Sequence, residues 1–348
     1  MKQVLVDLGK LKSLYSGLGQ VSAQYGKNLI LQKPPDMDFM YLLPRQYKSY
    51  FGSSVNYTYL NSIKRYFPSS NKKFDLWHAI HQDSAFLPGS TTPYLLTIHD
   101  LNFLREKSAS KSQMRLKKLQ AKVDRANAVV FISHFTETEA KSNLDIHVPA
   151  SVIYNGVEIS KTEAVKPAFI PVNCKNFLFS AGVILEKKNF HVLVDFMSLF
   201  EDTILIIAGD KSGSYANFIQ DKVTEKKLNK KIILPGIVSD REKIWLYQNC
   251  KAFLFPSKNE GFGLPVIEAM SFGKPVFVSN LTSLPEIAAD AGFYWKDFNP
   301  VEMTKVFHQN MKSAMSDENV NKRIDRAKFF SWEKNVSEYI KLYRSLMK

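Results

Sequence analysis

Residues 257–275 read SKNEGFGLPVIEAMSFGKP, and this stretch decides how the rest of the chain is interpreted. Gly261 and Gly263 allow a sharp turn and let backbone N–H groups approach a ligand closely, because glycine has no Cβ. The proline that follows suits the first turn of a helix, and the N-terminus of a helix attracts anions. The stretch therefore predicts a glycine turn that leads into a buried helix and binds an anionic group such as phosphate.

Two acids, Glu260 and Glu268, flank this turn. A carboxylate beside a phosphate site cannot favour phosphate by its charge, but it can accept hydrogen bonds from sugar hydroxyls, as an acid does in dinucleotide sites. The alternative is that both acids are incidental to the start of a buried helix. The glycines, the proline and the flanking Phe-Pro-Ser and Gly-Lys-Pro segments favour a pocket for a nucleotide or nucleotide sugar.

The block from Cys250 to Pro300 resembles the donor-binding region of retaining glycosyltransferases with two Rossmann-like domains. This is the GT-B type of family 4, group 1, which includes bacterial lipopolysaccharide and mannosyl transferases. The residues that carry the resemblance are Phe255-Pro256-Ser257, Glu260-Gly261-Phe262-Gly263-Leu264-Pro265, Glu268-Ala269, Gly273-Lys274-Pro275-Val276 and Leu284-Pro285-Glu286. A weaker similarity extends over nearly the whole chain. The resemblance implies an α/β fold of two doubly wound domains facing a cleft, with a C-terminal helix that crosses back to the first domain.

Short apolar runs alternate with helical stretches along the chain, which independently favours a parallel sheet in each half. The predicted strands are Val4–Leu8, Phe39–Leu43, Leu76–Ala79, Tyr94–Ile98, Ala128–Ile132 and Val152–Tyr154, then Phe177–Ala181, Ile204–Ala208, Ile232–Leu234, Ala252–Phe255 and Val276–Ser279. A proline-containing linker is predicted over residues 159–175. We expect an acceptor-binding domain over residues 1–165, a donor-binding domain over 166–328 and a crossover helix over 329–348.

The composition is that of a globular protein. A chain of 348 residues can form two domains with their own cores, and an apolar fraction of 45% is ordinary. No run of eighteen apolar residues occurs, and the first apolar stretch is too short for a secretory signal. The two cysteines, Cys174 and Cys250, show no metal-ligand spacing. We therefore expect a cytoplasmic protein without a membrane span.

The formal net charge of +14 indicates an anionic partner. The positive charge is concentrated in two clusters, which are Lys107, Lys111, Arg115, Lys117, Lys118, Lys122 and Arg125, and Lys222, Lys226, Lys227, Lys230 and Lys231. Each cluster is equally compatible with a solvated helix face. The functional interpretation is peripheral docking on the anionic inner face of the cytoplasmic membrane. Nucleic acid is disfavoured because no base-stacking aromatic pattern accompanies the charge.

A glycine turn with two lysines follows the predicted strand Phe177–Ala181. Lys187 and Lys188 can hold a diphosphate because lysine presents a mobile point charge, although two lysines on a surface turn are common. The resemblance implies that Lys188 is the diphosphate-binding lysine of the family. The family's arginine directly after the glycine is replaced here by Val183, and Lys187 stands where a related branch carries arginine.

Histidines supply a second set of candidates. His99 and Asp100 follow the predicted strand Tyr94–Ile98, and a histidine at a strand end can exchange protons or hydrogen bonds near neutral pH. Such a pair is more often structural. The resemblance implies that His99 lies near the transferred sugar, with Asp100 as a helper or structural cap. We place His78 and His81, which accompany another predicted strand, on the acceptor side together with Asp100.

The resemblance also implies donor contacts made through the backbone. Gly17 and Gly19 match the family's first glycine loop, which faces the donor phosphates. Val238 lies in a loop that meets the nucleobase in the family. Asp36 and Asp38 have the form of a metal-binding pair, but they follow two prolines and precede an apolar run. We interpret them as a solvated turn and expect no metal and no other cofactor.

These observations predict a retaining glycosyltransferase that moves a hexose from a nucleoside-diphosphate sugar to a glycan or lipid-linked acceptor of the bacterial envelope. GDP-mannose is the favoured donor and a UDP-hexose the next. The expected catalytic residues are His99, Glu260 and Lys188. The expected donor-binding residues are Gly17, Gly19, Lys187, Lys188, Val238, Glu260, Gly261, Phe262, Gly263, Leu264 and Glu268.

Three alternatives remain open from the sequence. Glu260 could act as a covalent nucleophile, whereas the resembled enzymes use the leaving phosphate to take the acceptor's proton. A sugar-nucleotide epimerase of similar two-domain shape would need an acid and histidine array that the sequence does not reveal. A basic nucleic-acid-binding protein would bind with a steep salt dependence and would be insensitive to Glu268→Ala.

Overall fold

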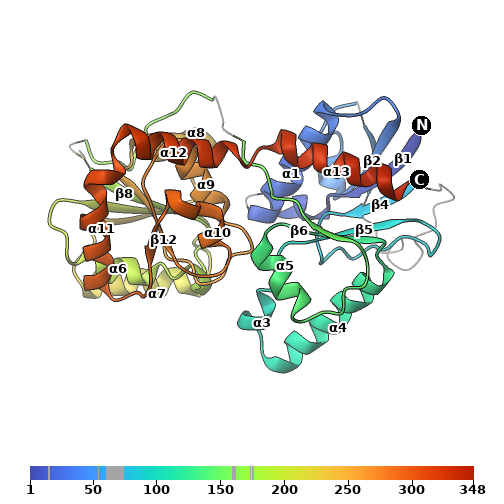
Figure 1. Cartoon of the computed structure of the whole chain (residues 1–348). Helices are drawn as coiled ribbons and strands as arrows, with labels where there is room; N and C mark the ends of the chain where they lie inside the picture. Colours follow the sequence, from blue (N-terminus) through green and yellow to red (C-terminus); the bar gives the residue numbers. More distant parts are fainter. Residues whose placement is uncertain (15, 54, 60–73, 159–161, 173, 175) are drawn as a thin grey trace. The chain divides into compact units, whose positions relative to one another are not determined.

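The computed structural model describes residues 1–14, 16–53, 55–59, 74–158, 162–172, 174 and 176–348. The chain divides into two compact units, which we call unit 1 (Met1–Glu158 with Phe330–Lys348) and unit 2 (Ile159–Phe329) (Figure 1). The linker predicted over residues 159–175 lies partly outside the described residues. Each unit is built on one parallel sheet with helices, so the predicted α/β class is confirmed.

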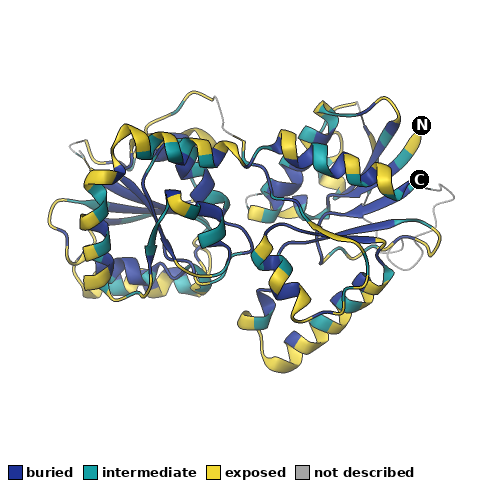
Figure 2. Cartoon of the chain, viewed as in Figure 1, coloured by how far each residue is buried: buried dark blue, intermediate teal, exposed yellow. Residues whose placement is uncertain are grey.

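Unit 1 contains a seven-stranded sheet in the order β3-β2-β1-β4-β5-β6-β7, and its strand pairs are parallel. The strands are β1 (Lys2–Asp7), β2 (Met37–Leu43), β3 (Asn56–Tyr59), β4 (Leu76–Ala79), β5 (Tyr94–Ile98), β6 (Ala128–Phe131) and β7 (Ala150–Val152). β4, β5 and β6 are buried at every position (Figure 2), as expected of parallel strands covered on both faces. The helices of unit 1 are α1 (Gly17–Leu31), α3 (Phe103–Glu106), α4 (Ala109–Arg125), α5 (His134–Lys141) and α13 (Trp332–Leu346).

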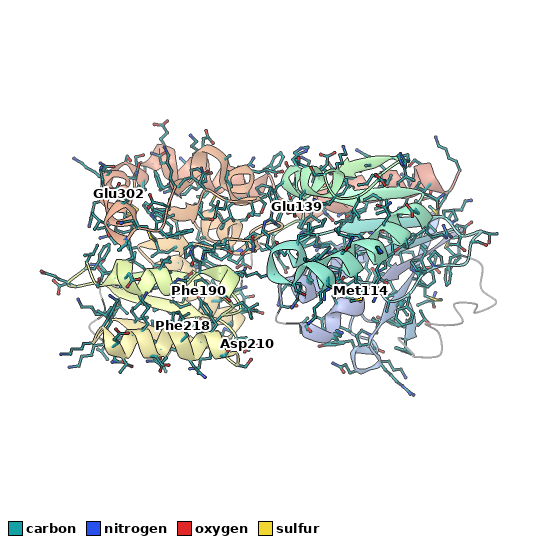
Figure 3. The ribbon with its side chains drawn as sticks, turned by 90° about the horizontal axis from the view of Figure 1, so that it is seen from below. Met114, Glu139, Phe190, Asp210, Phe218 and Glu302 are labelled. Atoms are coloured by element: carbon teal, nitrogen blue, oxygen red, sulfur yellow. The ribbon has the colours of Figure 1, made fainter. Side chains whose placement is uncertain are left out.

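Unit 2 contains a six-stranded parallel sheet in the order β10-β9-β8-β11-β12-β13. The strands are β8 (Phe177–Ala181), β9 (Ile204–Ala208), β10 (Ile232–Gly236), β11 (Ala252–Phe255), β12 (Val276–Ser279) and β13 (Phe293–Trp295). The helices are α6 (His191–Met197), α7 (Ser214–Glu225), α8 (Asp240–Asn249), α9 (Leu264–Ser271), α10 (Leu284–Ala288), α11 (Pro300–Ala314) and α12 (Asp317–Lys328), with the short turn η3 (Glu186–Lys188). Phe190, labelled in Figure 3, belongs to an aromatic core that also includes Phe196 and Phe307.

The strand order places the ends of particular strands together. In unit 2 the chain builds β8, β9 and β10 in one direction and then returns to add β11 on the other side of β8. The loops that leave the carboxyl ends of β8 and β11 therefore start side by side at a topological switch point, where open α/β sheets bind their ligands. Unit 1 has the corresponding point between β1 and β4.

The last helix, α13, packs in unit 1, which confirms the predicted return of the chain end to the first domain. Ser331 caps the helix by accepting a hydrogen bond from the Lys334 amide. Gly156 lies directly against its start, since a Cβ there would approach the Trp332 backbone nitrogen to 2.4 Å. Asn335 donates to the Tyr154 carbonyl at 2.7 Å. The start of α13 therefore depends on the small size of Gly156 and on the side-chain amide of Asn335.

Three of the four edge strands were missed or displaced in the sequence prediction, whereas the fourth, β10, begins at the predicted Ile232. β3 and β13 were not predicted, and β7 begins two residues before the predicted strand Val152–Tyr154. Ala150 and Ser151 are exposed, and so is Asn56 of β3. Edge strands lack the continuous apolar run on which the prediction depended, because one side of an edge strand needs no apolar cover. Within the described ranges, no helix combines the length and the apolar character needed to cross a bilayer.

A buried chain of hydrogen bonds fastens α13 to the sheet of unit 1. The Tyr343 hydroxyl contacts the Tyr25 hydroxyl at 2.6 Å and Nδ1 of His78 at 2.7 Å. Nε2 of His78 contacts Thr97 Oγ1 at 2.9 Å, and Thr97 in turn contacts the Tyr339 hydroxyl at 3.0 Å. Burial lowers the pKa of His78 to about 3, so this histidine is neutral in the folded protein at physiological pH.

This network predicts an acid-sensitive fold. Unfolded histidines take up protons below pH about 6.5, whereas folded His78 does not until about pH 3, so the stability that is complete above pH 6.5 is lost as the pH falls. We expect each such histidine to lower the free energy of unfolding by about 1.4 kcal/mol per pH unit. Urea unfolding of His78→Phe should show a lower stability at pH 7 but a flatter decline between pH 6 and 4.

Tyr343→Phe is the matched control. It removes a hydroxyl from the same network but no group that titrates between pH 4 and 7, so it should lower the stability without flattening the decline. Equal slopes for wild type and His78→Phe would contradict the assignment.

Candidate functional site

Lys188 and Glu260 meet at the switch point of unit 2. Lys188 ends η3 in the loop after β8, and Glu260 lies in the loop after β11. The Lys188 Nζ lies 2.5 Å from Oε1 of Glu260, and both side chains are only 13% exposed. The ammonium also lies 5.0 Å from the centre of the Phe255 ring. The structure therefore brings together two residues that the sequence assigned to one site.

Glycines let the loops at this edge approach one another. Gly182 and Gly209 have φ angles of +146° and +152°, which favour glycine. A Cβ on Gly209 would lie 1.8 Å from the Gly182 carbonyl oxygen, so a side chain cannot fit there. A Cβ on Gly182 would lie 3.6 Å from Cε of Lys188. The absence of a side chain at Gly182 leaves Lys188 beside bare backbone.

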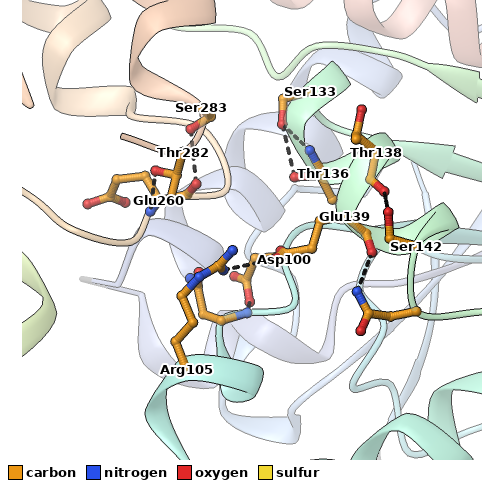
Figure 4. A network of polar contacts seen from close by, with 12 residues as sticks. Asp100, Arg105, Ser133, Thr136, Thr138, Glu139, Ser142, Glu260, Thr282 and Ser283 are labelled. Carbon is orange, nitrogen blue, oxygen red and sulfur yellow. Dashed lines mark hydrogen bonds and ion pairs between the residues drawn. The ribbon is translucent and has the colours of Figure 1, made fainter. Parts of the chain in front are cut away.

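The backbone of Glu260 is fixed on both sides (Figure 4). Its amide donates to Thr282 Oγ1 at 3.1 Å, and its carbonyl accepts from Ser283 Oγ at 3.0 Å. Thr282 has a φ of +54°, which is unusual for a β-branched residue. The single Ser283 hydroxyl proton is shared with the Phe262 carbonyl, whose oxygen lies 2.8 Å from Oγ. Thr282 and Ser283 thus position both the acid and the glycine turn, although no motif singled them out.

The glycine turn leads into α9 as the sequence predicted. Gly263 caps the helix with a φ of +119°, and Pro265 lies in the first turn. Gly261 and Phe262 are buried, whereas Leu264 is partly exposed. Because α9 begins at Leu264, the positive end of the helix dipole lies at this turn. Pro265 has no N–H, and the Val266 amide donates to the Gly263 carbonyl at 3.0 Å.

Glu268 lies in the second turn of α9 and contacts α8. Lys243 Nζ donates to Oε1 of Glu268 at 3.1 Å, and the Tyr247 hydroxyl donates to Oε2 at 2.8 Å. Glu268 raises the pKa of Lys243, and burial followed by the Glu268 charge raises the pKa of Tyr247 well above 10. Each carboxylate oxygen can accept a further bond. No sequence signal pointed to Lys243 or Tyr247, which belong to an ordinary amphipathic helix.

The remaining candidates of unit 2 lie on neighbouring loops. Lys187 is partly buried, and its carbonyl accepts from the Lys258 amide at 2.7 Å. Val238 is partly buried between β10 and α8, next to Ser239, which caps α8 with Glu242 in a capping box. Both loops leave the carboxyl edge of the sheet, as the prediction required.

The glycine loop of unit 1 opens α1. Ser16 caps this helix and accepts from the Gly19 amide at 3.1 Å. A Cβ on Gly19 would lie 2.1 Å from the Ser13 carbonyl oxygen, so close packing against the preceding turn explains this glycine. A Cβ on Gly17 would meet no heavy atom of the described residues within 4 Å, so the backbone there is open to a close approach.

His99 and His81 lie together at the carboxyl ends of β5 and β4. Their rings are 5.2 Å apart, and burial lowers the pKa of His99 to about 4 and that of His81 well below its usual value. Nε2 of His99 contacts the Ile80 carbonyl at 2.7 Å, while Nδ1 of His81 accepts from the Asp83 amide. Gln82, which the sequence did not flag, accepts from the His99 amide at 2.9 Å.

Two other candidates of unit 1 have partners within that unit. Asp100 accepts from the Asn102 amide at 3.0 Å, as expected of a structural cap. His78 is completely buried, and both of its ring nitrogens contact hydroxyls within unit 1. A residue without exposed surface cannot line an acceptor site in this conformation. Burial beneath α13 therefore accounts for His78, which the sequence had placed on the acceptor side.

The two aspartates of the metal-like motif pair with basic side chains. Arg344 contacts Asp36 at 3.1 Å, and Lys33 donates to Asp38 at 2.8 Å. Both acids lie at the amino end of β2, opposite the edge where sheets of this type bind ligands. Across the part of the chain that the structure describes, no group of three or more His, Cys, Asp or Glu side chains is arranged to hold a metal ion.

The conformation of Gly263 provides a test of this geometry. Gly263→Ala should lower the free energy of unfolding by at least about 1 kcal/mol, because the position has positive φ and a Cβ would meet Leu284 Cδ2 at 2.8 Å. Gly213→Ala is the matched control, since Gly213 has a φ of −86° and its Cβ would have only one described atom within 4.0 Å. Chemical denaturation of both variants checks this, and equal losses would contradict it.

Two family models match the chain in succession. Residues 38–161 match the model described as Glycosyltransferase Family 4, and residues 163–329 match the model described as Glycosyl transferases group 1. The chain is 27% identical over 242 residues to the O-antigen chain mannosyltransferase RfbU of Salmonella typhimurium, a match that covers 68% of this chain and 65% of that protein. It is 37% identical over 115 residues to O-antigen chain mannosyltransferase B of Escherichia coli, covering 32% of this chain and 29% of that protein. The matches thus span less than two thirds of the length of these relatives.

Solved structures share the fold along the whole chain. HepE from Anabaena in complex with UDP and glucose matches with a TM-score of 0.80 at 17% identity, covering 99% of this chain and 100% of that one. Sucrose-phosphate synthase from Thermosynechococcus elongatus matches with a TM-score of 0.77 at 18% identity, covering 99% of each chain. Together with the two family models, this architecture shows that the chain belongs to the family 4, group 1 glycosyltransferases of the GT-B fold.

Proposed function

We propose that the protein is a retaining glycosyltransferase that moves a hexose from a nucleoside-diphosphate sugar to a glycan or lipid-linked acceptor of the bacterial envelope. The observation that carries the proposal is the Lys188–Glu260 pair, 2.5 Å apart beside the start of α9. A cation, a helix N-terminus and a carboxylate at one edge of the sheet match a ligand that has a diphosphate at one end and sugar hydroxyls at the other.

The diphosphate is held by positive charge in this proposal. Lys188, assisted by Lys187, and the amides from Gly261 to Leu264 stabilise the leaving group as its charge develops. These groups supply the electrostatic stabilisation that a metal supplies elsewhere, so we propose a metal-independent reaction without a further cofactor.

The two carboxylates hold the sugar ends of the donor. Glu260 orients the hexose, and Glu268 accepts from the ribose hydroxyls with lone pairs that Lys243 and Tyr247 leave unused. The bond from the anomeric carbon to the diphosphate oxygen breaks, a bond to the acceptor oxygen forms on the same face, and the acceptor's proton passes to the leaving phosphate. A covalent mechanism, in which the Glu260 carboxylate attacks the anomeric carbon, is the rival to this assignment.

Unit 1 is the proposed acceptor-binding domain. His99 has a depressed pKa of about 4 and is neutral at physiological pH. Its Nε2 contacts a carbonyl, so that nitrogen carries the proton and Nδ1 is the acceptor. A neutral imidazole of this tautomer can accept a hydrogen bond from a sugar hydroxyl near the reacting centre.

The relatives suggest the substrates. RfbU and mannosyltransferase B are O-antigen chain mannosyltransferases by name, which favours GDP-mannose and an O-antigen or related lipopolysaccharide acceptor. UDP-hexose is the second candidate donor, because the structurally similar HepE was solved with UDP and glucose.

Ligand-induced stabilisation tests the donor site. In a thermal-shift screen of GDP-, UDP-, dTDP- and ADP-linked sugars, one class should raise the melting temperature, since a ligand at about one hundred times its Kd adds about 2.7 kcal/mol of stability. Lys188→Met should abolish this shift. Lys305→Met, at an exposed pair with Glu302 on α11, should retain it.

The same screen separates the alternatives. A shift in wild type that persists in Lys188→Met would contradict the assignment of the diphosphate site. Turnover of the stabilising sugar nucleotide without any acceptor, to an epimeric sugar, would favour an epimerase instead.

We further propose that the protein docks peripherally on the inner face of the cytoplasmic membrane through α4. The only acid in this helix is Asp124, and Lys111, Arg115 and Lys118 are exposed (Figure 2). Met114, labelled in Figure 3, is 50% exposed on the same helix. Two other members of the predicted cluster serve the fold instead, because they donate to backbone carbonyls: these are Lys122 and Arg125.

Vesicle sedimentation tests this surface. Replacing Lys111, Arg115 and Lys118 with glutamine should weaken binding to phosphatidylglycerol vesicles by more than about one hundredfold, since each charge contributes about 1 kcal/mol. Replacing Lys226, Lys227 and Lys230 of unit 2 is the charge-matched control and should have a much smaller effect. Equal losses in the two variants, or binding to neutral vesicles, would contradict docking through α4.

A further inference from the structure

The Lys188–Glu260 pair poses a problem for a diphosphate ligand. Its atoms are 2.5 Å apart, and each side chain is 13% exposed, so the lysine's charge is already neutralised in a sheltered position. An arriving diphosphate must share or displace the lysine's acid partner, and its own negative charge lies close to that acid. Like charges at such distances repel, and the repulsion is stronger where water is partly excluded.

Glu260 cannot simply turn away with its backbone. Thr282 and Ser283 hold its amide and carbonyl, so only the side chain can move. Lys188 has a second neighbour, because the Phe255 ring centre lies 5.0 Å from its ammonium. A diphosphate that binds Lys188 therefore competes with the Glu260 carboxylate for the lysine's charge, and the carboxylate stays close by.

A partly buried carboxylate that loses its partner is costly unless new donors replace it. The hexose of a nucleotide sugar carries hydroxyl groups that can donate to Glu260. A free nucleoside diphosphate has no such groups at this end. A nucleotide sugar can therefore give Glu260 new hydrogen bonds in place of those to Lys188. A free nucleoside diphosphate cannot.

We infer that Glu260 is a specificity-determining residue that makes the site favour the nucleotide sugar over the free nucleoside diphosphate. Its charge, paired with Lys188 in the unliganded protein, penalises any diphosphate that arrives without a sugar. The consequence for catalysis is weak binding of the diphosphate product, which promotes its release after transfer. The inference rests on the proposed function and adds to it a role of Glu260 in rejecting product.

Calorimetric titration with inorganic pyrophosphate tests the inference without knowledge of the base. Glu260→Gln removes the charge but keeps the shape, so pyrophosphate should bind this variant about tenfold more tightly than wild type, a difference of about 1.4 kcal/mol. With GDP and GDP-mannose, or UDP and UDP-glucose if the uridine pair binds, the preference for the sugar-bearing ligand should shrink by a similar factor. Lys188→Met should bind pyrophosphate more weakly than wild type.

The control is Glu186→Gln. Glu186 is an exposed acid two residues before Lys188 in η3, so the variant removes the same charge from the same loop without breaking the pair. It should change pyrophosphate affinity much less than Glu260→Gln does. Circular dichroism and thermal unfolding establish that each variant is folded.

The outcomes distinguish the inference from the function on which it rests. If wild type binds a nucleotide sugar and pyrophosphate but Glu260→Gln binds pyrophosphate no more tightly, the role in selectivity is wrong and the transferase proposal stands. If Glu186→Gln tightens binding as much as Glu260→Gln, general charge accounts for the effect and the inference is wrong. If neither pyrophosphate nor any nucleotide binds wild type or Glu260→Gln, both the inference and the proposed donor site are wrong.

Discussion

The site in unit 2 depends on how the chain orders its strands. After β10 the chain returns to β8, the first strand of this unit, and pairs β11 with its free side. Because β11 pairs with β8 on the side opposite β9, the loops after β8 and β11 start next to each other. This is what brings Lys188 and Glu260, 72 positions apart in the chain, into an ion pair. Gly209 lets the neighbouring loop approach the Gly182 backbone on the same edge, because a Cβ there would lie 1.8 Å from the Gly182 carbonyl oxygen. A parallel sheet with this strand order is therefore the constraint from which the site follows.

The two carboxylates of the site have different environments, and this separates their proposed tasks. Glu268 is bonded by Lys243 and Tyr247 of α8, so it is a positioned acceptor whose orientation is fixed from the next helix. Glu260 has its backbone fixed by Thr282 and Ser283, while its charge is directed at the lysine. The fixed orientation of Glu268 suits a constant contact with a ribose. The environment of Glu260 suits a residue whose partner changes when the ligand binds.

The sequence was most informative where local chemistry and topology coincide. The bounds of β8, β9, β11 and β12 agree with the predicted strands, since apolar runs in buried parallel strands are continuous. The glycine turn at Gly263 was predictable because few residues tolerate its φ. By contrast, Tyr247 and Gln82 also contact site residues, but no sequence motif distinguishes them. Any polar or aromatic residue would fit the local sequence pattern at either position. For His78 the sequence prediction was wrong, because a histidine near a strand end was assigned to the acceptor site. Its actual partners are the hydroxyls of Tyr343 and Thr97, which come from other segments of the chain.

The most direct test of this account is a crystal structure of the protein with the nucleotide sugar that stabilises it most. We expect the diphosphate at the start of α9 against Lys188, the hexose in contact with Glu260, and the ion pair of the free protein replaced by contacts to the ligand. Electron density for the ligand elsewhere, with the Lys188–Glu260 pair intact and the start of α9 unoccupied, would contradict the account.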